Sequence, residues 1–253
     1  MMLVSAIVFD LDNTLVECTK YFAEARTRLY RMILPLRPDL SREEFERVFR
    51  KIDTKNMRSP LGFGRDRFPT STQEAYRVLC EEVGYTPTPS ELEAAWAIGE
   101  SVFEAPYKPY PGAIATLEWC RSQGLRLGLC TKGDPEVQRQ KIERHGLERF
   151  FDHIAIVPQK HASEIGRTVD ALGLPRREAV MVGDSLREDI DGGKMAGLAT
   201  VWVKGDATDF HELYPDTDHA HPDAVIERIS ELAHTIATRW PLRQRRGRIP
   251  FAV

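Results

Sequence analysis

Short apolar segments alternate along this chain with segments of helical periodicity, and this alternation limits the folds it can adopt. Strand-length runs rich in Val, Ile and Leu occur at Leu3–Phe9, Leu125–Cys130, His153–Val157, Ala179–Val182 and Ala199–Val203, with a shorter one at Ala224–Ile226. Helical patterns lie between them at Gly112–Gln123, Glu136–His145, Ser163–Leu172 and Asp189–Ala196. Nearly continuous apolar runs suit strands covered on both faces, so we expect an α/β fold with a doubly wound parallel sheet.

One long span interrupts this alternation. Between Glu17 and Lys108 no strand is evident, and helical periodicity recurs at Tyr21–Leu34, Arg42–Lys55, Thr72–Val83 and Ser90–Phe103. The span separates the first strand from the rest of the sheet, which is typical of an inserted domain. We therefore predict an inserted helical domain at 17–108, a Rossmann-like core formed by 1–16 and 109–238, and a basic C-terminal tail at 239–253.

Polar residues follow four of the predicted strands at the point where each strand ends. In an open parallel sheet the ligand crevice lies beyond the carboxyl ends of the strands, so these residues are expected to converge. They are Asp10 and Asp12 after the first strand, Thr131, Lys132 and Gly133 after the second, Lys160 after the third, and Asp184, Glu188 and Asp189 after the fourth. Several carboxylates with a lysine and a hydroxyl suit a divalent cation and a phosphoryl group.

Each of these side chains has a plausible chemical role. Asp10, at the tip of a strand, is a candidate carboxylate nucleophile if a cation and Lys160 cancel its repulsion from a phosphate. Asp12 lies two residues further on and is a candidate acid and base. Thr131 offers a hydroxyl to a phosphate oxygen, and the helix after it offers N-terminal amides. Asp184 would hold the cation, with Asp189 or Glu188 as a further ligand or a supporting partner.

These residues also carry a family resemblance. The segment Phe9–Leu15, which reads FDLDNTL, resembles the DxDxT motif of the haloacid dehalogenase-like hydrolase superfamily. Thr131, Lys160 and the segment Val182–Ser185 are similar to its second, third and fourth motifs. The resemblance implies a phosphatase with a helical cap of the first type, in which Asp10 is nucleophile and Mg²⁺ ligand. It also implies that Asp12 is the acid/base and a ligand through its backbone carbonyl, and that Asp184 binds Mg²⁺ directly.

Two features of the motifs limit the choice within this superfamily. The acid at Asp12 argues against the dehalogenase branch, in which a halide leaving group needs no proton. Lys132 stands where many members have Asn, and two placements of its side chain remain open, one at the pocket and one in solvent.

Three function classes are considered: a phosphatase acting on a small phosphorylated metabolite, a phosphotransferase or phosphomutase using the same aspartyl-phosphate, and a non-catalytic binding protein. The intact motifs favour the first.

Other polar segments have both a functional and a structural interpretation. Phe63 and Arg65, in a Gly-rich loop of the cap, are candidates for reading the substrate, although such a loop more often only links two helices. His211, His219 and His221 with Asp216 and Asp218 suggest a second metal site, but a polar loop is favoured. The arginine-rich tail is interpreted as a solvated terminus, with Trp240, Ile249 and Phe251 as residues able to dock it.

Composition places the chain among ordinary globular proteins. The formal net charge of −3 gives no indication of nucleic-acid binding, and four cysteines without a CxxC pair suggest buried free thiols. The apolar stretch before Asp10 is too short to span a bilayer and carries no basic leader. We therefore expect a cytoplasmic enzyme, a monomer or homodimer, that needs no membrane partner.

Overall fold

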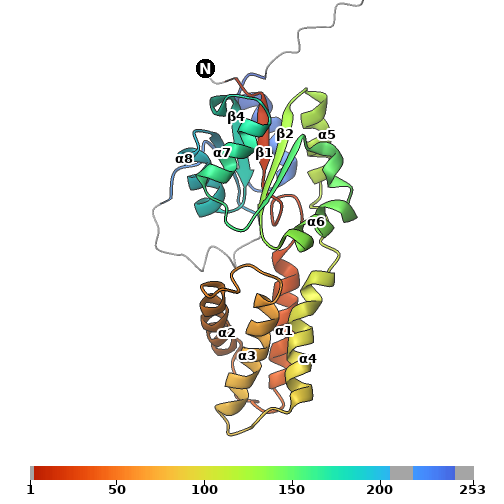
Figure 1. Ribbon diagram of the computed structural model, residues 1–253, viewed down its shortest axis with the longest axis vertical. Helices are drawn as coiled ribbons and strands as arrows, with labels where there is room; N and C mark the ends of the chain where they lie inside the picture. The colour runs from red at the N-terminus through yellow and green to blue at the C-terminus, as the bar shows by residue number, and fades with distance from the viewer. Residues whose placement is uncertain (1–2, 206–218, 243–253) are drawn as a thin grey trace, which may run out of the picture. The chain divides into compact units, whose positions relative to one another are not determined.

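The computed structural model describes residues 3–205 and 219–242 (Figure 1). The chain forms two compact units. One is an α/β unit made of the residues up to Glu17, Lys108–Lys132 and the described residues from Ile142 onward. The other is a helical unit made of Cys18–Tyr107 and Gly133–Lys141.

A single parallel sheet forms the centre of the α/β unit. Within the described residues it has the strand order β3-β2-β1-β4-β5-β6, and every neighbouring pair is parallel. The strands are β1 (Ala6–Phe9), β2 (Arg126–Lys132), β3 (His153–Val157), β4 (Ala179–Gly183), β5 (Ala199–Val203) and β6 (Ala224–Ile226). The order reverses direction at β1, so a ligand crevice is expected where β1 and its neighbours end.

Side chains of β1 alternate between two apolar cores, as the two-residue period of a strand requires. Ala6 and Val8 pack on one face with helix α7 (Ala162–Ala171) and with Ala196 and Leu198, which follow helix α8 (Gly192–Met195). Ile7 and Phe9 pack on the other face with α5 (Ala113–Ser122) and α10 (Leu232–Arg239). Burial on both faces explains the nearly continuous apolar runs, and the predicted doubly wound α/β fold is confirmed.

The helical unit is built from α1 (Thr19–Ile33), α2 (Arg42–Met57), α3 (Arg67–Glu81) and α4 (Pro89–Glu100). Two of these helices have the capped starts that their sequences suggest. The Ser41 side chain accepts a hydrogen bond from the Glu44 amide, and Thr88 and Glu91 form a reciprocal capping box. Helix α6 (Pro135–Arg144) follows β2, and its Val137 packs in the core of the helical unit.

Short 3₁₀ turns complete the described elements. They lie at Ser101–Glu104, Leu147–Phe150, Arg176–Glu178 and Ile229–Glu231. No helix in the described part of the chain is both long enough and apolar enough to cross a membrane. All four cysteines are buried and free, which confirms the expectation of buried thiols.

The segment after β4 differs from the sequence prediction. One helix was expected at Asp189–Ala196, but a π-helix spans Leu186–Asp191 and α8 follows it. The Ser185 carbonyl accepts hydrogen bonds from both the Asp189 amide at 2.9 Å and the Ile190 amide at 3.1 Å. The second of these bonds closes the wide turn of a π-helix, a form that is rare and frequent at functional sites. The predicted start of this helix was therefore wrong by three residues.

Candidate active site

Asp10 directly follows the central strand of the sheet. Its amide donates to the Val182 carbonyl at 2.9 Å, which continues the pairing of β1 with β4 by one residue. The residue is only 5% exposed. Burial raises the pKa of Asp10 to about 7, against the opposing effect of the Lys160 ammonium. A desolvated carboxylate at a strand end has the placement that a nucleophile needs, provided that cations compensate its charge.

The chain turns back on itself after Asp10. The amides of Leu15 and Val16 both donate to the Leu11 carbonyl, and Asn13 adopts a left-handed backbone with φ of 59°. Asp12 is half-buried in this turn. Its negative charge contributes to the raised pKa of Asp10, after the larger effects of burial, Lys160 and Asp189. The first motif therefore keeps its two acids within electrostatic reach of each other.

Lys160 links two of the buried acids. Its Nζ lies 2.5 Å from Asp10 Oδ1 and 2.6 Å from Asp189 Oδ1, and the Lys160 side chain is 3% exposed. Burial opposes the charge of the ammonium, but the carboxylates of Asp10 and Asp189 hold the pKa of Lys160 well above its usual value. The lysine is thus a fixed positive charge beside the candidate nucleophile.

Asp184 and Asp189 complete a cluster of acids at the end of β4. Burial raises the pKa of both carboxyl groups, and the charges of Asp10 and Asp189 add to the effect on Asp184. Asp189 Oδ2 accepts a hydrogen bond from the Ser185 amide at 3.0 Å. A Cβ on Gly183 would lie 2.1 Å from Asp189 Oδ2, so the strand approaches the acid at a point where only glycine fits.

Oxygen atoms of Asp10, Asp184 and Asp189 lie within 4.8 Å of one another, and this is the cluster of possible metal ligands found among the described residues. Three buried carboxylates face one ammonium, so the cluster lacks positive charge. Hard carboxylate oxygens suit Mg²⁺, and a divalent cation would supply the missing charge. The residues present therefore fit a magnesium ion.

Residues of the second motif lie at the end of β2. Thr131 is 1% exposed. Lys132, whose placement the sequence left open, forms an ion pair with Glu188, and its side chain is 11% exposed. Burial lowers the pKa of Lys132, against the opposing effect of Glu188. The Lys132 side chain therefore does not point into solvent.

The loop that begins at Gly133 leads into helix α6. Asp134 Oδ1 accepts hydrogen bonds from the Glu136 amide at 3.0 Å and the Val137 amide at 3.2 Å. The first-turn amides that were expected to favour a phosphate thus already bind a carboxylate of the chain itself. Gly133 has φ of 146°, and a Cβ there would lie 3.3 Å from the Gln138 side chain.

Two supporting contacts to Asp184 were not anticipated in the sequence analysis. Trp202 in β5 donates its indole N–H to the Asp184 carbonyl at 2.8 Å, and the Thr14 hydroxyl lies 3.5 Å from Asp184 Oδ1. Thr14 could have been found from its place in the first motif. Nothing in the sequence indicated a role for Trp202, because an aromatic residue in a strand is ordinarily part of a core.

The two candidate substrate residues of the predicted cap, Phe63 and Arg65, have partners within the helical unit. Arg65 lies 3.5 Å from Glu104 Oε1 and 3.6 Å from Glu100 Oε1, and its guanidinium is 5.5 Å from the centre of the Phe103 ring. The Arg67 guanidinium lies 5.9 Å from the centre of the Phe63 ring. These contacts account for the placement of both side chains, and a role in substrate binding stays a prediction.

Of the second metal site considered, His211, Asp216 and Asp218 lie outside the described residues. His219 Nδ1 lies 2.8 Å from Asp191 Oδ2. Trp240 is 8% exposed and packs in the core of the α/β unit, whereas Ile249, Phe251 and the rest of the tail beyond 242 lie outside the described residues.

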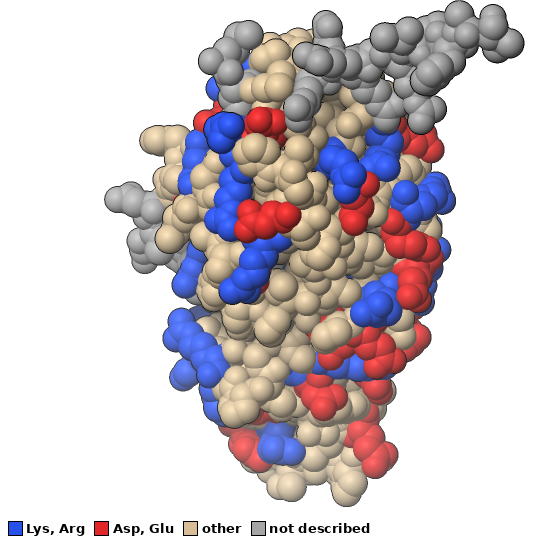
Figure 2. Space-filling model, turned by 45° about the horizontal axis from the view of Figure 1, so that its top comes forward, with Lys and Arg blue, Asp and Glu red and all other residues tan. Residues whose placement is uncertain are grey.

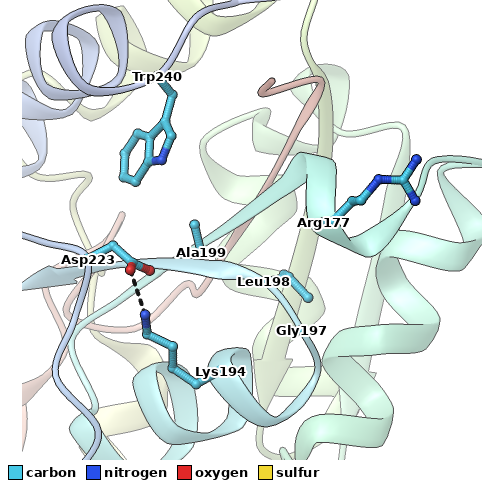
Figure 3. Close-up of a pocket in the computed structure, with 7 residues that line it drawn as sticks. All are labelled: Arg177, Lys194, Gly197, Leu198, Ala199, Asp223 and Trp240. Carbon is cyan, nitrogen blue, oxygen red and sulfur yellow. Dashed lines mark ion pairs between the residues drawn. The ribbon is translucent and has the colours of Figure 1, made fainter. Parts of the chain in front are cut away.

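A cavity of about 550 Å³ lies at the other end of the sheet, where β4 and β5 begin (Figure 3). Lys194 and Asp223 form an ion pair across it at 2.6 Å, below the ring of Trp240 in the view. None of the motif residues lines this cavity.

Basic and acidic side chains are interspersed over much of the face in Figure 2, as expected for a net charge of −3.

Comparison with known proteins identifies this arrangement. A family model described as haloacid dehalogenase-like hydrolase matches residues 4–197. The chain belongs to the haloacid dehalogenase-like hydrolase family. The superfamily resemblance inferred from the four motifs is thereby confirmed.

Curated relatives and solved structures agree with this family assignment. The chain is 29% identical to a glyceraldehyde 3-phosphate phosphatase of Methanopyrus kandleri, over 92% of this chain and 97% of that one. It is 30% identical to a protein of the same name in Pyrococcus furiosus, over 92% and 93%. A crystal structure of a haloacid dehalogenase-like hydrolase from Xanthomonas campestris superposes with a TM-score of 0.73, at 20% identity over 94% of this chain and 96% of that one. The expectation of a phosphoric monoester hydrolase is confirmed with the family.

Proposed function

We propose that this protein is a Mg²⁺-dependent phosphatase that hydrolyses a small phosphorylated metabolite through an aspartyl-phosphate on Asp10. The observation that carries the proposal is the contact of the Lys160 ammonium with both Asp10 and Asp189 inside a buried carboxylate cluster. Burying such a cluster costs free energy of folding, because each carboxylate loses its hydration. Groups buried at this cost are often found at active sites. Phosphoryl transfer uses both the carboxylate and the surrounding cations.

In the first half of the reaction, an oxygen of Asp10 attacks the phosphorus of the ester. A bond forms between Asp10 and phosphorus while the bond from phosphorus to the leaving oxygen breaks, and Asp12 donates a proton to that oxygen. In the second half, Asp12 takes a proton from a water molecule whose oxygen attacks phosphorus. The bond to Asp10 then breaks, and the products are an alcohol, inorganic phosphate and the original carboxylate.

Asp10 and Asp184 would hold Mg²⁺ through their carboxylates and Asp12 through its backbone carbonyl, as the family resemblance implies, with Asp189 as a ligand or supporting partner. When bound, Mg²⁺ neutralises charge on the phosphoryl oxygens and on the nucleophile. Lys160 provides a second fixed positive charge beside Asp10, and the Thr131 hydroxyl donates to a phosphoryl oxygen. Lys132 and Gly133, next along the chain, border the same phosphate position.

The substrate is proposed to be small, because a helical cap excludes water only from a substrate that it can enclose. The names of the relatives make glyceraldehyde 3-phosphate the first compound to test. Phe63 and Arg65 of the cap loop remain candidates for recognising the part of the substrate beyond its phosphate.

The test is release of inorganic phosphate from a panel of small phosphate esters that includes glyceraldehyde 3-phosphate, with and without Mg²⁺. We expect Mg²⁺-dependent turnover that is lost in Asp10→Asn, and retained in Asp170→Asn, which removes an exposed acid paired with Arg176 at 2.6 Å. Activity that survives in Asp10→Asn would overturn the aspartyl-phosphate mechanism. Phosphate appearing on an added sugar or alcohol instead of in solution would favour a phosphotransferase or mutase.

A further inference from the structure

A second ion pair involves Glu188, an acid to which the mechanism above assigns no role. Lys132, the last residue of β2, contacts Oε1 of Glu188 in the π-helix. The two side chains are 11% and 27% exposed, so water screens the pair only in part. The backbone of Glu188 is also fixed, because its amide donates to Ser185 Oγ at 3.1 Å.

Glu188 is the immediate neighbour of Asp189, yet it is not a member of the cluster. The oxygens within 4.8 Å of one another belong to Asp10, Asp184 and Asp189. The charge of Glu188 nevertheless reaches this region, because it contributes to the raised pKa values of Asp189 and Lys160, after the larger effects of burial and of nearer charges. A fourth carboxylate therefore belongs to the residue next to Asp189 in the chain, and it is paired with Lys132.

The number of carboxylates matters for the choice of cation. Three carboxylates and the Lys160 ammonium leave two net negative charges, which one divalent cation balances. Mg²⁺ demands six ligands in a tight octahedron and keeps several waters, whereas Ca²⁺ accepts six to eight oxygens and favours sites with more carboxylates and bidentate contacts. A glutamate released from its ion pair beside Asp189 would thus raise the affinity of the site for Ca²⁺ relative to Mg²⁺.

We propose that Lys132 is a positioning residue that holds the Glu188 carboxylate out of the cation's ligand set, so that the site stays selective for Mg²⁺ over Ca²⁺. The inference rests on the proposed function, because it takes the cluster to be the magnesium site. It explains a lysine at a position where, by the resemblance, many members of the family have Asn. It also explains why a long cationic side chain there is largely buried against an acid.

The test is calorimetric titration of purified wild-type protein and Lys132→Met with MgCl₂ and with CaCl₂, without substrate. The ratio of Ca²⁺ to Mg²⁺ affinity is expected to rise about tenfold in Lys132→Met, because the freed glutamate adds a charged ligand that Ca²⁺ accepts more readily. If the only effect of Lys132→Met were the loss of a positive charge, both cations would bind more tightly by the same factor. The ratio of Ca²⁺ to Mg²⁺ affinity would then be unchanged. An unchanged ratio would therefore overturn the proposal.

Further variants separate recruitment of the glutamate from other effects. The double variant Lys132→Met/Glu188→Gln is expected to return the ratio to the wild-type value, and a raised ratio that persists in it would also overturn the proposal. Lys194→Met removes a lysine of the same unit that is paired with Asp223 at 2.6 Å at the opposite end of the sheet, and it is expected to leave the ratio unchanged.

Circular dichroism of each variant checks its fold. If Lys132→Met does not fold, the proposal is tested with Lys132→Gln, which shortens and neutralises the side chain. Mg²⁺-dependent hydrolysis by the wild type together with an unchanged ratio would refute this inference and leave the proposed function intact. Absence of phosphatase activity together with a raised ratio would refute the function and leave the cation selectivity standing.

Discussion

Gly183 is the residue at which a single added methyl group should do most damage to the candidate site. An ideal Cβ there would lie 2.1 Å from Asp189 Oδ2, 2.2 Å from its Cγ and 2.6 Å from its Cβ. The Gly183 backbone is not in the left-handed region that disfavours alanine. The cost of Gly183→Ala is therefore steric, and it falls on a side chain whose own Cβ is in the way.

The magnitude follows from what Asp189 would lose. Overpacking a filled interior costs about 1–3 kcal/mol. Moving the carboxylate also breaks its hydrogen bond from the Ser185 amide at 3.0 Å and its contact with Lys160 at 2.6 Å. A hydrogen bond to a charged group contributes about 1.5–3 kcal/mol. We expect a destabilisation of about 3–5 kcal/mol, which lowers Tm by roughly 10 °C in a protein of this size, together with loss of turnover.

The assay is thermal unfolding followed by circular dichroism, with phosphate release measured on the same samples. Gly173→Ala is the matched control, because Gly173 has φ of +70° and nothing within 4 Å of its would-be Cβ. It should cost about 1–2 kcal/mol through backbone strain and leave turnover unchanged. Should Gly183→Ala lower the stability by less than 1 kcal/mol, or by no more than the control, Asp189 would not be pinned against the strand as described.

Four further outcomes are expected. Lys160→Met leaves two buried carboxylates without their ammonium, so it should cost about 3–5 kcal/mol in chemical denaturation at neutral pH and abolish phosphate release; a stable, active variant would contradict this. Trp202→Phe removes the 2.8 Å hydrogen bond to the Asp184 carbonyl and should cost about 1 kcal/mol and weaken Mg²⁺ binding in calorimetry; wild-type binding would show that the bond does not position Asp184. Because the pKa of Asp10 is raised from 3.8 to about 7, its contribution to stability is complete below pH 3.8 and is lost as the pH rises through about 7; Mg²⁺ should therefore raise Tm more at pH 8 than at pH 5, and the reverse order would refute the assignment. Burial raises the pKa of Cys120 to about 12, so this thiol should react with a disulfide reagent only after unfolding, and rapid labelling of the native protein would contradict its burial.

Much of the fold could be predicted from the sequence because its central strands are buried on both faces. Two-sided burial requires an apolar residue at nearly every position, and that pattern located the central strands β1, β2, β4 and β5. The less buried strands His153–Val157 and Ala224–Ile226 at the two edges of the described sheet were also matched to the residue. The helix after β4 was misplaced, because its start depends on the Ser185 carbonyl accepting two amides. Such a choice between backbone hydrogen bonds leaves no mark in hydrophobic periodicity.

The sequence by itself determined which residues are available for the chemistry. The order of motifs along a parallel sheet implied that Asp10, Lys160 and Asp184 lie at the same edge, since the carboxyl ends of parallel strands share one side. Only the tertiary structure decided how these charges are paired. It joined Lys160 to Asp10 and Asp189, turned Lys132 toward Glu188 and brought Trp202 to the Asp184 carbonyl. The physical reason is that ion pairs and hydrogen bonds act over a few ångströms between residues far apart in the chain, and sequence spacing carries no information at that scale.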